Sequence, residues 1–133
     1  MIAACLIGLC YFAAIFSFAF AMGVARQLVV APHLGATAAV LLEVPIIILA
    51  SWMVARRLLR RRAFSLAQRG VMGGTAFILT MASEASLAML IRGQSLADWS
   101  MELLTPLGLV GLAAQVAFGC MPILAGRGRT EPS

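Results

Sequence analysis

Four long apolar segments constrain the fold of this chain more than any other feature. They lie at residues 2–25, 35–55, 71–91 and 103–125, and none of them contains Lys, Arg or His. A transmembrane helix needs about 20 consecutive apolar residues, and in lipid a helix satisfies every backbone polar group within one segment. We therefore expect an all-α polytopic membrane protein, an antiparallel bundle of four transmembrane helices that forms a single domain over residues 1–126.

Composition leads to the same conclusion and narrows the function classes. Hydrophobic residues make up 62% of the 133 residues and charged residues 11%, and the mean hydropathy is +1.01. These values lie outside the range of soluble globular domains. Because four spans use most of the chain, no room remains for a separate catalytic domain. The expected surroundings are the lipid bilayer, and nucleic acid is not an expected partner.

The distribution of arginine predicts the orientation in the membrane. All ten basic residues are Arg, and six of them lie in the segment RRLLRRRAFSLAQR at residues 56–69. These six are Arg56, Arg57, Arg60, Arg61, Arg62 and Arg69. The polar tail at 127–133 carries two more, whereas the other two connections carry only Arg26 and Arg92. The positive-inside rule then places both termini, the tail and the central connection in the cytoplasm.

The arginine-rich segment itself has two interpretations. It reads as an amphipathic extension of the second helix that anchors the topology, and the alternative is a site for anionic lipid head groups or an acidic partner. Arginine without lysine in an alanine-rich chain is typical of a GC-rich bacterial genome. We therefore expect the bacterial inner (plasma) membrane as the location.

No pattern for catalysis or metal binding is present in the sequence. His33 is the only histidine, and the three cysteines are too scattered for a redox or metal motif. We expect no catalytic residues, no metal and no cofactor, with an intramembrane enzyme as a remote exception. One further motif is local: Ser95 and Asp98 in SLADWSMEL have the spacing of a capping box, which predicts a short amphipathic helix on the outer surface.

Polar residues inside the spans are the candidate functional residues. Glu43 on the second helix and Glu84 on the third each lie roughly 12 Å from the outer edge, at 1.5 Å per residue, and we expect these two antiparallel helices to be adjacent. Ser17 on the first helix falls at the same level, and Gln115 on the fourth lies slightly deeper. Thr80 and Ser83 lie near Glu84 on its helix. Intramembrane acids are candidate functional residues by default, so we expect a polar layer that faces the bundle interior.

Two features around this layer remain open. Arg26 or Arg92 at the outer ends of helices is a possible ion-pair partner for one of the two acids. Pro45 removes a backbone hydrogen bond two residues after Glu43, and the resulting kink is either a moving hinge or a static bend.

The segment VARQLVVAPHLGATAAVLLEVP at residues 24–45, together with Glu84 and the MPIL segment at residues 121–124, resembles a group of small uncharacterised four-helix proteins of bacterial inner membranes. This resemblance implies the architecture and the location, and it implies no activity. In size and helix number the chain is also similar to small multidrug-resistance exporters. Their essential Glu lies in the first helix, whereas residues 2–25 contain no acid.

Two functions are compatible with these features. The first is a non-catalytic auxiliary, assembly or oligomer-forming component, with a second copy or another membrane protein as partner. The second is a proton-linked small carrier or export component that uses Glu43 and Glu84. The sequence favours the first, because four helices leave little room for a substrate cavity.

Overall fold

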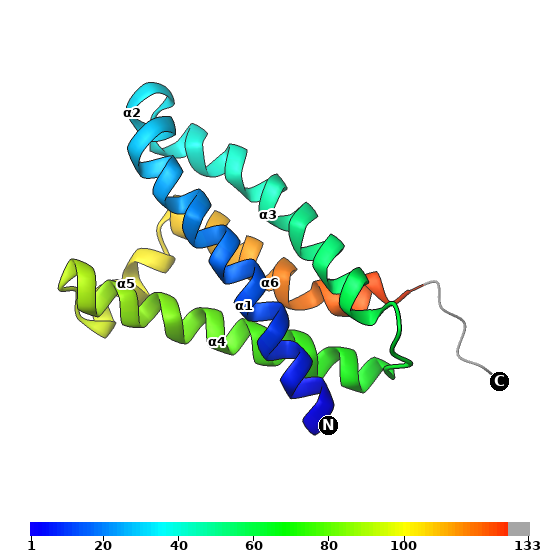
Figure 1. Ribbon diagram of the computed structural model, residues 1–133. Coiled ribbons are helices and arrows are strands. Elements are labelled where there is room, and N and C mark those ends of the chain that lie inside the picture. Colours follow the sequence, from blue (N-terminus) through cyan, green and yellow to red (C-terminus); the bar gives the residue numbers. More distant parts are fainter. Residues whose placement is uncertain (128–133) are drawn as a thin grey trace.

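The computed structural model describes residues 1–127, and this part of the chain is helical without a strand (Figure 1). Its elements are α1 (Ile2–Ala25), the π-helix η1 (Arg26–Val30), α2 (Ala31–Leu34), α3 (Ala36–Leu59), α4 (Leu66–Arg92), α5 (Leu96–Leu103) and α6 (Pro106–Ala125). Four helical stretches are long and apolar enough to cross a membrane: Ile2–Leu34, Ala36–Leu59, Leu66–Arg92 and Pro106–Ala125. The predicted helical class and the four candidate spans are therefore confirmed. The predicted cytoplasmic tail lies outside the described residues from position 128 onward.

Helix α1 has the predicted bounds, but helical structure continues beyond its end. The sequence placed its end at Ala25 because Arg26 follows, but the helix continues through η1 and α2 to Leu34. Within this continuation the N–H of Ala31 bonds to the carbonyl of Arg26, five residues back, which is the π-helical spacing. The helix stops at Gly35, whose φ of 84° is strained for residues with a side chain.

The arginine-rich connection is an amphipathic extension of the second helix only in its first part. Helix α3 ends at Leu59, and a turn and an irregular segment follow. A new helix, α4, begins at Leu66 because Ser65 and Gln68 form a capping box, each side chain bonded to the other's backbone N–H, at 3.2 and 2.9 Å.

The fourth apolar segment of the sequence starts at residue 103, and its transmembrane-length helix starts at Pro106, as the capping-box interpretation of the preceding segment also indicated. The predicted short helix at SLADWSMEL exists as α5, and its capping box joins Ser95 and Asp98. The backbone breaks after Leu103 and starts again at Pro106, with the Thr105 hydroxyl accepting the N–H of Gly108 as the cap of α6.

Helix packing does not follow the order of the chain. The first span packs against α3 and α4, and α6 packs against the same two helices (Figure 1). Within residues 1–127 the backbones of α3 and α4 do not come close to each other. The sequence treated these two helices, which carry Glu43 and Glu84, as neighbours. The structure corrects this, because the first span and α6 lie between them.

The core lies toward the end of the molecule that carries the α3–α4 connection. Tyr11 is fully buried there, where its hydroxyl donates to the Phe118 carbonyl at 2.8 Å and its ring stacks on the Phe118 ring at 4.6 Å. Gly73 of α4 meets Gly119 of α6 so closely that a Cβ on Gly73 would collide with the Gly119 carbonyl oxygen. Small residues allow such close approach of helices in membranes. From this tight end the helices diverge toward α2 and α5 (Figure 1).

Candidate intramembrane binding site

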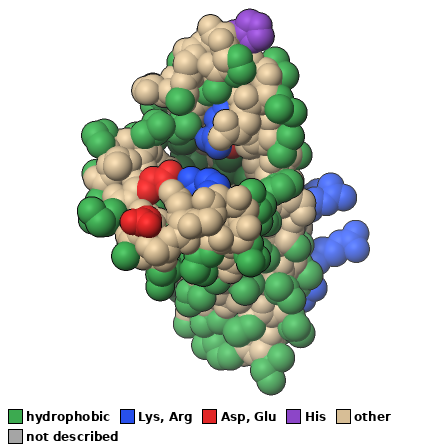
Figure 2. Space-filling view, turned by 90° about the vertical axis from the view of Figure 1, so that its left-hand side faces the viewer, with side chains coloured by type: hydrophobic (Ala, Val, Ile, Leu, Met, Phe, Trp, Pro, Cys, Tyr) green, Lys and Arg blue, Asp and Glu red, His purple; other side chains and the backbone are tan. Residues whose placement is uncertain are grey.

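A cavity of about 600 Å³ lies between the diverging ends of the helices. All four spans line it, and most of its wall is apolar. Its polar side chains are Arg26, Gln27, Glu43, Thr80, Glu84 and Gln115. Figure 2 shows the face between α2 and α5, where the molecule is hollowed and acidic and basic side chains gather among hydrophobic ones. The volume and the lining are those of a site for a small molecule with one polar part.

The first polar link across this cavity is an ion pair. Arg26 Nη1 lies 3.0 Å from Glu43 Oε2, and the Glu43 side chain is only 10% exposed. The two atoms are close but do not have hydrogen-bond geometry, so Glu43 Oε2 is buried without a hydrogen bond. The π-helical turn that begins at Arg26 supports this side chain, and such turns occur frequently at functional sites. The pair connects the first span to α3.

The second polar link is a hydrogen bond between α4 and α6. Gln115 Nε2 donates to Glu84 Oε2, while the other amide atom, Gln115 Oε1, is buried without a partner. Glu84 makes no ion pair within the described chain. Thr80 also lines the cavity, but its hydroxyl already donates to the Ala76 carbonyl of its own helix at 2.9 Å.

Ser17 and Ser83 do not join these residues. Both line a separate hollow between α1 and α4, and Ser17 is exposed. Ile15 of the same helix points into the core, and two residues rotate a helix by about 200°. Ser17 therefore shares the depth of the polar layer but faces the opposite direction, which an argument from depth alone does not reveal.

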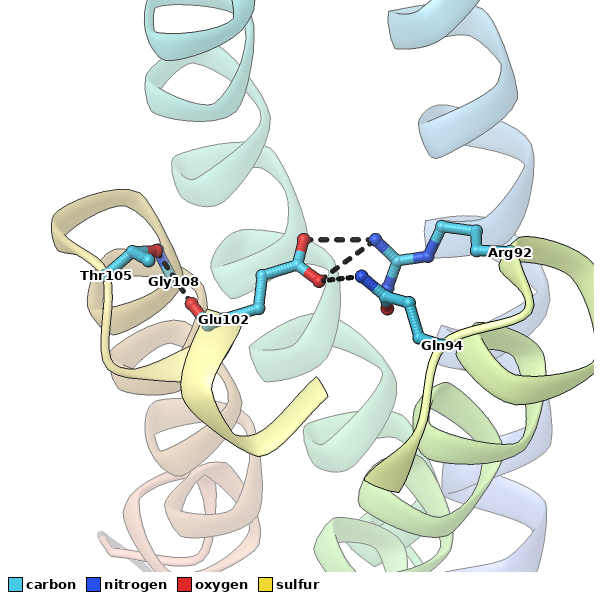
Figure 3. Close-up of polar contacts among 5 residues, drawn as sticks. All are labelled: Arg92, Gln94, Glu102, Thr105 and Gly108. Carbon is cyan, nitrogen blue, oxygen red and sulfur yellow. Dashed lines mark hydrogen bonds and ion pairs between the residues drawn. The ribbon is translucent and has the colours of Figure 1, made fainter. Parts of the chain in front are cut away.

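Arg92 contacts a different acid from the two in the spans. Its Nη1 atom donates to both carboxylate oxygens of Glu102, at 3.0 and 3.2 Å (Figure 3). Gln94 Nε2 donates a further hydrogen bond to Glu102 Oε2 at 2.9 Å. The Glu102 carbonyl accepts the Thr105 hydroxyl, which caps α6. This cluster was not predicted from the sequence, although Arg92 at the end of α4 and Glu102 within α5 carry opposite charges. The hydrogen bonds from Gln94 and Arg92 hold the pKa of Glu102 below its ordinary value of 4.5.

Pro45 is exposed, on a face of α3 that does not pack against the other helices. The helix continues on both sides of it from Ala36 to Leu59. Whether this position is a hinge stays a prediction.

The six arginines of the predicted anchor lie at the other end of the molecule. Arg56, Arg60, Arg62 and Arg69 line a second pocket there, of about 350 Å³, whereas Arg57 and Arg61 do not.

No group of three His, Cys, Asp or Glu side chains suited to hold a metal ion occurs within residues 1–127. In comparisons with known proteins, no family model, no curated protein and no solved structure matches the chain.

Proposed function

We propose that this protein is a small proton-linked carrier or export component of the bacterial inner membrane, whose ligand occupies the cavity between the four spans. The cavity is the observation that carries this proposal, because all four spans line about 600 Å³ of mostly apolar space that contains two carboxyl groups. The sequence favoured an auxiliary role because a four-helix chain has little room for a ligand. A volume in the range of ligand sites removes that objection.

The proposed arrangement is a four-helix transmembrane bundle with both termini in the cytoplasm. The arginine-rich connection between α3 and α4 supports this orientation through the positive-inside rule. In that orientation the cavity lies in the outer half of the bilayer, because Glu84 precedes the outer end of α4 at Arg92 by roughly 12 Å.

Glu84 is the proposed proton-exchanging group. Its hydrogen-bond partner is the neutral amide of Gln115, whereas Glu43 faces the cation of Arg26. Protonation of Glu43 would leave a partly buried arginine without its counter-charge, which is costly. Protonation of Glu84 leaves no charged partner behind, because the Gln115 amide that donates to it is neutral. Glu43 and Arg26 are then a fixed pair that shapes the cavity.

A transport experiment with Glu84→Gln tests this role. Thermal-shift screening of amphipathic small molecules identifies ligands that stabilise the purified protein. Proteoliposomes that contain the pH-sensitive dye pyranine then report proton movement when such a ligand is added. We expect Glu84→Gln to keep the melting temperature and to lose the ligand-driven pH change. Unchanged proton movement in both Glu84→Gln and Glu43→Gln would reject the carrier function.

A second pair of variants tests the cavity itself. A Cβ added at Gly111 meets open space, and Gly111 lines the cavity, so Gly111→Leu fills the cavity without a backbone collision. Gly74 also has open space around an added Cβ, but it does not line the cavity. We expect ligand-induced stabilisation to disappear in Gly111→Leu and to persist in Gly74→Leu. Equal stabilisation of both variants would place the ligand elsewhere.

The auxiliary or assembly function is the second candidate, and the two polar links favour it. Arg26–Glu43 ties the first span to α3, and Glu84–Gln115 ties α4 to α6, as expected of groups that fix helix register. This function predicts that Glu43→Gln and Glu84→Gln change the oligomeric state or partner binding in detergent. Size-exclusion chromatography with light scattering measures that change.

A further inference from the structure

A pocket with an unusual number of arginines lies where three separate parts of the chain meet. Its volume is about 350 Å³. Arg56 lies in α3, Arg60 and Arg62 lie in the connection between α3 and α4, Arg69 lies in α4, and Arg127 is the second residue after the end of α6. The pocket therefore gathers arginines that are up to 71 positions apart, between Arg56 and Arg127. It does not contain the whole arginine-rich segment, because Arg57 and Arg61 lie outside it.

No acidic side chain of the described residues lines this pocket. The four acids within residues 1–127 are Glu43 and Glu84 in the cavity lining, and Asp98 and Glu102 in α5. The guanidinium groups of Arg56, Arg62, Arg69 and Arg127 surround one small space and repel one another, and an anion that enters the pocket relieves this repulsion.

Several arginines are held in position by neighbouring residues. The guanidinium of Arg56 lies over the Trp52 ring at 5.0 Å, and that of Arg62 lies 5.9 Å from the Phe64 ring centre. Arg69 packs directly on the backbone of Gly126, where a Cβ would collide with the guanidinium. A pocket whose donors are already positioned loses less side-chain entropy when it binds an anion.

We propose that this arginine pocket binds a phosphate-ester anion, whose charge is shared by guanidinium groups from α3, α4 and the end of α6. Arginine suits phosphate because its planar donors form paired, charge-assisted hydrogen bonds with the oxygens. The remaining lining is apolar, with Trp52, Leu59, Leu124 and Ala125. The pocket also lies at the ends of three spans, where lipid head groups are found. A phospholipid head group and a soluble phosphate ester share this chemistry, and the experiment distinguishes them.

Fluorescence of Trp52 measures occupancy of the pocket, because this ring is part of its wall. The full-length protein carries Trp99→Phe, which leaves Trp52 as the only tryptophan. Phosphatidate with brominated acyl chains quenches nearby tryptophan, and brominated diacylglycerol, which lacks the phosphate, is the matched control lipid. Glycerol 3-phosphate is the soluble probe, added as a competitor and titrated alone by calorimetry.

Two double variants separate a defined site from general attraction to positive charge. Arg69→Gln with Arg127→Gln removes two arginines of the pocket, and Arg57→Gln with Arg61→Gln removes the same charge outside it. We expect saturable quenching by brominated phosphatidate, at least about tenfold weaker binding in the pocket variant, and less than about a twofold change in the control variant. Circular dichroism checks that both variants fold.

The competition assigns the source of the phosphate. Displacement by glycerol 3-phosphate at concentrations near those of phosphatidate shows that the ester alone suffices, and lack of displacement assigns the site to the lipid. Either result supports the proposal. Equal quenching by brominated diacylglycerol, together with no calorimetric binding of glycerol 3-phosphate, would overturn it. Equal loss of affinity in the two double variants would also overturn it.

Discussion

At the scale of single residues, the ion pair between Arg26 and Glu43 connects the first span to α3 in the lining of the cavity. Arg26 and Arg92 were both predicted as candidate partners for the intramembrane acids, and depth along a helix did not distinguish them. In the structure Arg26 pairs with Glu43, whereas Arg92 pairs with Glu102 outside the spans. Both pairings depend on how the helices pack, so sequence reasoning did not distinguish them.

Replacement of Glu43 by Gln is expected to destabilise the protein because it leaves Arg26 without its counter-charge. We expect a loss of about 1 to 3 kcal/mol in the free energy of unfolding, less than for a fully buried pair because the Arg26 side chain is 30% exposed. The double variant Arg26→Gln with Glu43→Gln should recover at least half of this loss. Denaturant unfolding in detergent measures both, with the exposed Ser17→Ala as control. Additive losses in the double variant would contradict a direct interaction.

At the scale of elements, small residues set how closely helices approach, and capping residues set where they begin. The Ser95–Asp98 capping box predicted α5 correctly, and Ser65 and Gln68 start α4 by the same motif. Helix α1 ends at Ala25 as predicted, but the helical stretch continues through η1 and α2 to Leu34, past the charged residue that was taken as its boundary. A charge that pairs inside the molecule does not end a helix, and its partner is visible only in the fold.

The crossing of α4 and α6 offers a sensitive test with a matched control. Gly73→Ala places a methyl group against the Gly119 backbone, and we expect it to cost about 1 to 3 kcal/mol of stability through overpacking. The adjacent Gly74→Ala meets open space and should be neutral or slightly stabilising, because alanine is the better helix former. Thermal unfolding of the two variants in the same detergent measures the difference. Equal melting temperatures would show that the crossing tolerates a wider separation.

The attachment of α5 to α4 is expected to depend on pH. The pKa of Glu102 is lowered in the folded protein by hydrogen bonds from Gln94 and Arg92. Its contribution to stability is therefore present above the ordinary pKa of 4.5 and is lost as the pH falls through the lower, folded value. Because the group is largely exposed, we expect no more than about 1 kcal/mol.

Melting curves between pH 6 and pH 3 provide the measurement for α5. The wild-type protein should lose more stability than Glu102→Gln over this range, and the two should converge at the acid end. Parallel curves at every pH would show that the Glu102 cluster contributes nothing to the attachment of α5.

At the scale of the whole molecule, the sequence predicts the class better than the arrangement. Apolar length is enough to identify four spans, because the hydrocarbon layer sets a minimum length for each. Which spans are neighbours depends on side-chain packing, such as Tyr11 against Phe118 and Gly73 against Gly119. The cavity follows from that packing, since a core concentrated at one end lets the other ends diverge. Glu43, Glu84 and Gln115 were predicted as one polar layer from their depth along the helices. They do line one cavity, although the helices that carry them are not all neighbours.

Reporter fusions test the proposed orientation of the whole chain. We expect a fluorescent protein fused after Ser133 to fluoresce and alkaline phosphatase at the same position to be inactive, since the C-terminus is proposed to be cytoplasmic. A phosphatase inserted after Gly93, between α4 and α5, should be active. The reverse pattern would contradict the orientation and would place the cavity in the inner half of the bilayer.

The π-helical turn at Arg26–Val30 also affects how related sequences should be aligned. Such a turn holds about one residue more than an α-helical turn, so the helix after it is rotated by roughly 100° relative to the helix before it. The apolar face of α1 consequently does not continue in phase into α2. An alignment of this chain with a protein whose first span is regular throughout should contain a one-residue gap at positions 26–30. Without that gap, every residue from Ala31 to Leu34 would be compared with a position about 100° away around the helix.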